Sequence, residues 1–165
     1  MQALSTLRLT IELVPATCWY SNVRSNVTAK TWCRLQQQHF ARAKHRCQIC
    51  QGRGPAHPVE LHEIWQYDDA TATQRLTGLI ALCPDCHEVK HIGYAIRHGR
   101  LPQALAHLVQ VNHLTVADAE VQIREAFTLH AGRSKRTWRL DLSILSRQFG
   151  VVLDTEGRER GLVHG

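Results

Sequence analysis

Apolar and polar residues alternate along residues 4–14, and a helical pattern follows further along the chain. Because successive side chains of a strand point to opposite faces, the alternation predicts a strand that Pro15 ends. In residues 29–45 apolar positions recur at helical spacing, and Thr28 stands where a helix N-cap is expected. The other face of this predicted helix is basic. Such a face is either solvated or turned towards phosphate groups.

The central part of the chain predicts a strand, a polar loop, a second strand and a helix. Residues 59–65 and 78–82 are short apolar runs, and residues 67–74 between them are mostly polar. Short apolar runs of this kind are typical of strands. A turn begins at Pro84, and the spacing that follows predicts one helix that reaches residue 97.

The rest of the chain is mainly helical by the same criteria. Helices are predicted over residues 101–114 and 116–130, with Thr115 capping the second and Gly132 ending it. A strand over residues 138–142 and one or two helical turns over residues 143–149 follow. The order predicts a single α+β domain. Its parts are an N-terminal strand and helix extension (1–46), a central module (47–97), a helical extension with a short strand (98–150) and a flexible tail (151–165).

Composition narrows the class of protein. The 165-residue chain carries a formal net charge of +6, which fits a polyanionic partner such as nucleic acid, although many basic domains bind none. It has no uncharged apolar run as long as the roughly 18 residues of a membrane span. Its first residues lack the pattern of a signal peptide. We therefore expect a cytoplasmic protein without a membrane partner.

Two Cys-x-x-Cys pairs, Cys47/Cys50 and Cys83/Cys86, are the most specific motif in the chain. Each such turn holds two thiolates at neighbouring corners of a tetrahedron, and two turns complete a four-thiolate zinc site. The alternative is that one pair is a redox centre, which typically has a single pair in a thioredoxin-like setting. We predict a structural Zn²⁺ on the four cysteines.

Three histidines in the same region can bind a second ion. His87 and His91 are four residues apart on a predicted helix and therefore share one face, while His62 lies on the first predicted strand of the module. Three imidazoles leave coordination positions open on a divalent ion, which a catalytic site requires.

The segments CQIC, ELHEIW and LCPDCHEVKH resemble the HNH endonuclease family. The similarity is specific over residues 47–91, and the stretches CWYSNVRS and DLSIL extend it to small stand-alone bacterial proteins of that family. It implies a ββα-metal core with the zinc knuckle beside a catalytic divalent ion (Mg²⁺, Mn²⁺, Ni²⁺ or Zn²⁺) on His62, His87 and His91. The implied activity is metal-dependent hydrolysis of phosphodiester bonds, with double-stranded DNA as the expected substrate.

Two positions depart from the family pattern. Glu63 stands where the family has its general-base histidine, and Gly78 stands where an asparagine orients that histidine. Glu63 could accept a proton from water if burial raises its pKa, and a carboxylate has no tautomer for an asparagine to fix. We expect Glu63, His62 and His87 to be the catalytic residues. The alternatives are Glu63 as a metal ligand, with or without His62 as the base, and a centre that binds metal without cleaving.

Four basic residues are expected to contact nucleic acid. They are Lys90, Arg133, Lys135 and Arg136. Lys90 directly precedes His91 and either binds a phosphate or is solvated, whereas the other three belong to a basic run after the last long predicted helix. If the centre does not cleave, we expect the same scaffold to bind nucleic acid or a protein partner.

Overall fold

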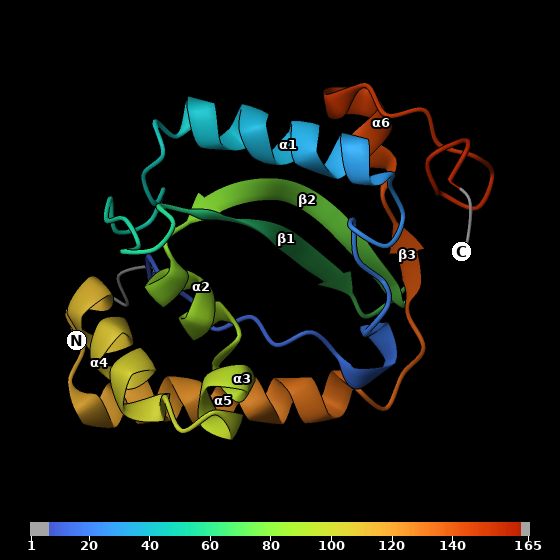
Figure 1. Cartoon of the computed structure of the whole chain (residues 1–165). Coiled ribbons are helices and arrows are strands. Elements are labelled where there is room, and N and C mark those ends of the chain that lie inside the picture. Colours follow the sequence, from blue (N-terminus) through green and yellow to red (C-terminus); the bar gives the residue numbers. More distant parts are fainter. Residues whose placement is uncertain (1–6, 163–165) are drawn as a thin grey trace.

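A long, twisted antiparallel hairpin forms the centre of the molecule (Figure 1). The computed structural model describes residues 7–162. β1 (Glu60–Asp68) pairs with β2 (Thr73–Leu82), and β3 (Arg139–Asp141) adds to the other edge of β2 in parallel. Both hairpin strands are longer than the sequence predicts, because the polar stretch expected to be a loop continues the ladder down to the Asp68–Thr73 pair.

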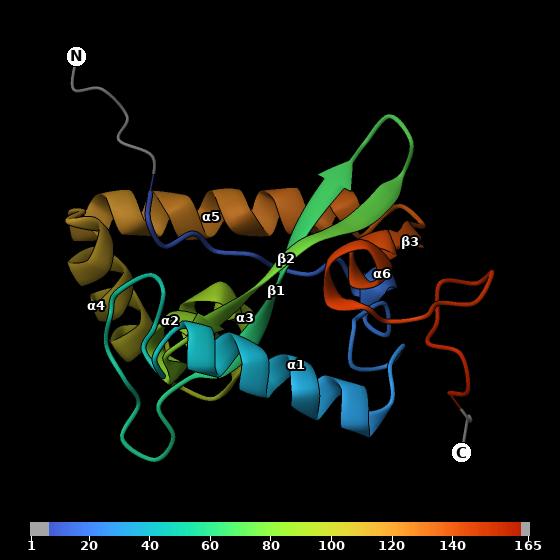
Figure 2. The same ribbon diagram turned by 90° about the horizontal axis from the view of Figure 1, so that it is seen from above.

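One face of the hairpin is covered by α1 (Ala29–Arg42) and α6 (Ser143–Phe149) (Figures 1 and 2). The predicted N-cap of α1 is confirmed, because the Thr28 side chain accepts a hydrogen bond from the Thr31 amide at 3.2 Å. Leu35 of α1 is fully buried in a core with Leu61, Leu79 and Leu145. Odd-numbered positions of β1 before its bulge therefore face α1.

The opposite face carries the remaining helices. They are α2 (Pro84–Lys90), α3 (Ile92–Arg97), α4 (Leu101–Asn112) and α5 (Val116–Arg133). The sequence predicts one helix over residues 84–97, but the backbone leaves helical geometry at His91 and divides it into α2 and α3. Gly132 does not end α5, which continues to Arg133. Leu82, Val89, Ile92 and Leu108 form the second core between these helices and the hairpin.

The N-terminal strand prediction is wrong for the part of residues 4–14 that the structure describes. Residues 7–15 form an extended segment with no strand pairing, and residues 4–6 lie outside the described chain. The segment runs between α5 and the α2–α3 pair (Figure 2), and its Glu12 side chain contacts His62 of β1. Its apolar residues pack instead, with Leu9 fully buried in the second core. A short 3-10 helix, Ala16–Cys18, follows.

Residues 151–162, where the sequence predicts a flexible tail, fold back on α1. The Glu159 carboxylate accepts hydrogen bonds from the Thr28 amide (2.6 Å) and the Thr31 hydroxyl (2.7 Å). Val151 is buried, and Leu153 forms an isolated bridge with Glu159. Residues 163–165 lie outside the described chain. The last described segment therefore helps to hold the start of α1.

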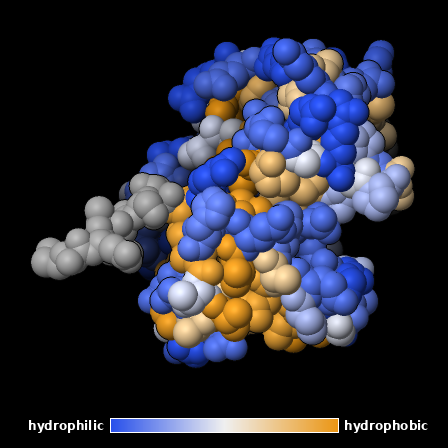
Figure 3. Space-filling model, turned by 90° about the vertical axis from the view of Figure 1, so that its left-hand side faces the viewer, coloured by the Kyte–Doolittle hydropathy of each residue, from blue (hydrophilic) through white to orange (hydrophobic). Residues whose placement is uncertain are grey.

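The surface is mixed in character. Figure 3 shows the side on which α4 lies, where hydrophobic residues form a patch bordered by hydrophilic ones. Within residues 7–162, no helix combines the length and the apolar composition that crossing a membrane demands.

Candidate metal centres

Four cysteine thiols meet where the knuckle before β1 contacts the start of α2. All four Sγ atoms lie within 4.8 Å of one another, and those of Cys50 and Cys83 are 3.5 Å apart. Four thiolates around a tetrahedral ion at a metal–sulfur distance of about 2.3 Å would be separated by roughly 3.8 Å. The two Cys-x-x-Cys turns are thus brought together as the sequence predicts, in a group that could hold a metal ion.

The backbone around these cysteines is arranged to support negative sulfur. The amide of Cys50 points at Cys47 Sγ (3.5 Å), that of Gly52 at Cys50 Sγ (3.3 Å) and that of Cys86 at Cys83 Sγ (3.5 Å). His107 of α4 adds a side-chain contact, with Nε2 3.1 Å from Cys86 Sγ. Donors of this kind outside the ligands orient and tune a thiolate site.

The thiols also share charge unequally. Hydrogen bonds from Cys83 and Cys86 lower the pKa of Cys47 far below its usual range. The same bonds hold the donors neutral, raising the pKa of Cys83 to about 12 and that of Cys86 further. Four thiolates at this spacing repel one another, and a bound cation would remove that repulsion. The donor set therefore fits a soft divalent ion.

Three imidazoles form a second group on the face of the hairpin that carries α2 and α3, opposite α1. His62 comes from β1, His87 from α2 and His91 from the break between α2 and α3. Their ring centres are 5.3, 5.1 and 4.8 Å apart. Imidazoles on a tetrahedral ion, at metal–nitrogen distances of about 2.0–2.1 Å, would have ring centres roughly 5 Å apart. The predicted three-histidine group is present and could hold an ion.

The environment favours the neutral form of His62 and His91, which metal ligation requires. Burial lowers the pKa of His62, which is 5% exposed, although the neighbouring Glu12 opposes this effect. Burial and the nearby His62 and His87 lower the pKa of His91 to about 3. An unprotonated nitrogen is therefore present on both rings at neutral pH.

Two carboxylates bonded to the histidines were not predicted from the sequence. Glu60 accepts a hydrogen bond from His87 Nδ1, and Glu12 Oε2 lies 3.0 Å from His62 Nε2. Glu60 is two residues before His62 on β1 and so shares its face, a signal that the sequence offered. Glu12 is 50 residues away from His62 in the sequence, within a segment misassigned as a strand. Nothing local in the sequence indicates its position.

Glu63 is not brought together with the histidines. Residues 62 and 63 pair in regular register with Ile80 and Leu79, so their side chains leave opposite faces of the hairpin. Glu63 Oε1 accepts a hydrogen bond from the Val23 amide at 2.7 Å, on the α1 side. Burial raises the pKa of Glu63 to about 7, against the effect of hydrogen bonds from Val23, Trp65 and Arg24. The expected shift in pKa is present, but away from the histidines.

Gly78 faces the histidine side, opposite Ile64, at the bulge of the hairpin. A Cβ built on Gly78 would make an ordinary contact of 3.6 Å with Ile64 Cδ1. Space therefore does not exclude a side chain at this position, and the structure gives no steric reason for glycine.

The basic residues predicted to contact nucleic acid differ in whether their charged groups are exposed or already bonded within the protein. Lys90 is neither solvated nor available to a phosphate, because it is 5% exposed and its ammonium group donates to Glu12 and Thr10. Arg133 stacks over the Tyr67 ring at 4.5 Å, and Arg136 donates to the Asp69 side chain and backbone. Lys135, the remaining residue of the predicted basic run, is exposed.

The chemistry of the two groups is distinct. Four sulfurs at a buried junction of the knuckle and α2 are typical of a structural site, whereas three nitrogens leave an ion with further coordination positions. Comparisons with protein-family models, with curated proteins and with solved structures give no match, so these two clusters of side chains carry the functional assignment.

Proposed function

We propose that the chain is a metal-dependent phosphodiesterase of the HNH type. Its ββα-metal unit would consist of β1, β2 and α2, with Zn²⁺ on the four cysteines. The observation that carries the proposal is the convergence of His62, His87 and His91 from a strand and a helix at metal-binding distances. The ion at this group would be Mg²⁺, Mn²⁺, Ni²⁺ or Zn²⁺.

A divalent ion on three imidazoles supplies a Lewis acid for a phosphate oxygen and lowers the pKa of bound water. The residues of the chain itself would orient the histidine ligands of this ion. Glu60 holds the His87 ring by Nδ1, and His62 is held through Nε2. Glu63 has no role in this chemistry, because its carboxylate is bonded on the opposite face of the hairpin.

Double-stranded DNA is the proposed substrate, and the net charge of +6 favours a polyanion. Lys135, in the turn that follows α5, is exposed and able to contact phosphate groups. The exposed basic residues of α1, Lys30 and Arg42, belong to the helix on the other face of the hairpin. They would contact the phosphates of a DNA duplex that is long enough to extend past the edge of the sheet.

A second candidate is a zinc-stabilised module that binds nucleic acid or a protein partner without cleaving. One observation favours it. No side chain next to His62 in sequence is free to act as a base on the histidine side, since Glu63 faces α1 and Leu61 is buried in the α1-side core.

Plasmid cleavage separates the two candidates. The zinc-loaded protein is incubated with supercoiled plasmid and Mg²⁺, Mn²⁺, Ni²⁺ or additional Zn²⁺, beside His87→Ala purified in the same way. Nicking by the wild type that the variant lacks supports the phosphodiesterase. Equal nicking by both, or none with any metal, rejects it for DNA, and a gel-shift assay of the same samples then tests the binding module.

A further inference from the structure

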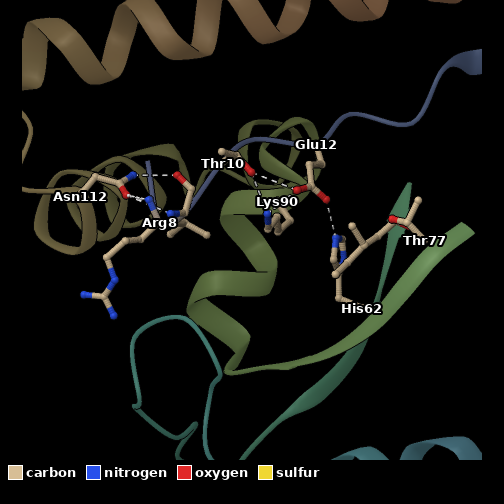
Figure 4. A network of polar contacts seen from close by, with 9 residues as sticks. Arg8, Thr10, Glu12, His62, Thr77, Lys90 and Asn112 are labelled. Carbon is tan, nitrogen blue, oxygen red and sulfur yellow. Dashed lines mark hydrogen bonds and ion pairs between the residues drawn. The ribbon is translucent and has the colours of Figure 1, made fainter. Parts of the chain in front are cut away.

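The N-terminal segment is fixed against the helices at several points (Figure 4). The Asn112 side chain of α4 brackets the segment, with Oδ1 accepting from the Arg8 and Leu9 amides (both 2.9 Å) and Nδ2 donating to the Leu9 carbonyl (2.7 Å). Further along, the Glu12 amide donates to the Lys90 carbonyl at 3.0 Å. The backbone on both sides of Thr10 is therefore held in place.

This docking presents one carboxylate to the histidine group. Glu12 Oε2 faces His62 Nε2, while Glu12 Oε1 accepts from the Lys90 ammonium group and from the Thr10 hydroxyl (3.0 Å). Lys90 Nζ also donates to Thr10 Oγ1 at 2.9 Å. Each oxygen of Glu12 thus has a defined partner, so its orientation towards His62 is fixed.

We infer that Glu12 is a positioning residue of the histidine metal centre, and that the docked N-terminal segment completes this centre. By accepting the proton of His62 Nε2, Glu12 selects the tautomer in which Nδ1 carries the free lone pair. Nδ1 is then the ligand atom of His62. A carboxylate behind a ligand histidine fixes the tautomer and the ring orientation and makes the ligand more basic.

Direct ligation by Glu12 is the competing arrangement. The group of mutually close ligand atoms contains the three histidines and does not include Glu12. Both Glu12 oxygens are already bonded, one to a ligand ring and one to a buried ammonium group. Glu60 stands in the same relation to His87 as Glu12 does to His62. Two carboxylates behind two ligand rings form a consistent second layer around one ion.

The role of Glu12 rests on the proposed histidine metal centre but not on cleavage of DNA. Binding of metal is therefore the suitable readout. The cysteine site is first filled with one equivalent of Zn²⁺, and Co²⁺ is then titrated into the histidine site and followed by its visible absorption. The variants are Glu12→Gln, which keeps the shape of the side chain, and Asn112→Ala, which releases the segment without touching the centre. Glu63→Gln is the matched control, since it changes a glutamate adjacent to His62 on the opposite face.

We expect Glu12→Gln to weaken Co²⁺ binding by about 10–100-fold, the usual effect of losing such a partner. Asn112→Ala should weaken it in the same direction, and Glu63→Gln should leave it within about twofold of the wild type, because its side chain makes no contact with the centre. Binding by Glu12→Gln at the affinity of the wild type would overturn the inference.

Isotope-edited NMR of the wild type loaded with Cd²⁺ identifies the liganding nitrogen directly and does not depend on how any variant folds. Coupling of the metal to Nδ1 of His62 is expected. Coupling to Nε2 would reject the tautomer assignment and favour Glu12 as a ligand. A protein that binds metal in the expected way but never nicks DNA would refute the phosphodiesterase alone.

Discussion

His62 and Glu63 are neighbours in the sequence, yet their side chains leave opposite faces of the β1–β2 hairpin. The pairing with Ile80 and Leu79 is continuous here, and the first irregularity comes later, between Ile64 and Trp65. A metal ligand and an adjacent general base on the same side of a strand would need such an irregularity between them. The hairpin therefore places His62 in the three-histidine group that could hold an ion, and Glu63 in the packing beneath α1.

The position of Glu63 predicts a pH dependence of stability. Its pKa is raised from 4.5 to about 7, so the folded state binds this proton more tightly than the unfolded chain does. The contribution of Glu63 to stability is therefore complete below about pH 4.5 and is lost as pH rises towards 7. A shift of this size corresponds to at most about 3 kcal/mol.

Urea unfolding of the wild type and Glu63→Gln between pH 4.5 and 8 measures this contribution. We expect the variant to gain stability relative to the wild type across that range, while the other titrating groups cancel in the difference. A constant difference in the free energy of unfolding at all pH values would contradict the assignment.

Motifs whose members are close in sequence were predictable. Each Cys-x-x-Cys turn fixes two sulfurs, and the spacing of His87 and His91 places both rings on one side. The meeting of the two turns and the approach of His62 depended on the tertiary fold. The place of Glu12 beside the histidines depended entirely on the tertiary fold, because its partner His62 lies 50 residues further along the chain. Its carboxylate carried no local pattern that distinguishes a positioning residue from a solvated side chain.

The errors in secondary structure have physical causes. Residues 7–15 alternate as a strand does, but their backbone is bonded to the Lys90 carbonyl and the Asn112 side chain instead of to a strand. The hairpin extends into a polar stretch because β3 pairs with β2 along residues 73–75. This third strand supports the far end of the hairpin, where Thr73 and Gln74 are buried. Residues 151–162 lack an apolar pattern, yet Glu159 binds the start of α1.

Removal of metal from the cysteine site is expected to unfold the central module. Binding of structural zinc contributes about 10–16 kcal/mol, which matches or exceeds the 5–15 kcal/mol stability of a typical domain. Treatment with a strong chelator should abolish the cooperative thermal transition followed by circular dichroism, and added Zn²⁺ should restore it. Cys86→Ser should behave like the chelated protein. Cys33→Ser changes an exposed free thiol on α1 and should melt like the wild type.

His107 offers a finer test of the same site. Its Nε2 lies 3.1 Å from Cys86 Sγ, so an N–H donated to the thiolate would lower the negative charge that the ion must balance. We expect His107→Leu to raise the Kd for Zn²⁺ about tenfold in a competition with a chromophoric chelator. His98→Leu is the control, because it changes an exposed histidine at the end of α3 whose ring contacts Tyr94. Equal zinc affinity of His107→Leu and the wild type would exclude a role for this contact.

The pair formed by Lys90 and Glu12 predicts a strong coupling between two substitutions. Lys90 is 5% exposed, and Glu12 neutralises its charge. Glu12→Leu leaves the ammonium group buried without a counter-charge, at a cost of about 3 kcal/mol in the free energy of unfolding. In Lys90→Met/Glu12→Leu neither charge is left, and apolar side chains fill the space, so most of that loss should be recovered. Urea unfolding of the wild type, both single variants and the double variant gives the coupling energy. Additive effects of the two substitutions would mean that the ammonium group reaches water once Glu12 is removed, and that the pair does not hold the N-terminal segment against α2.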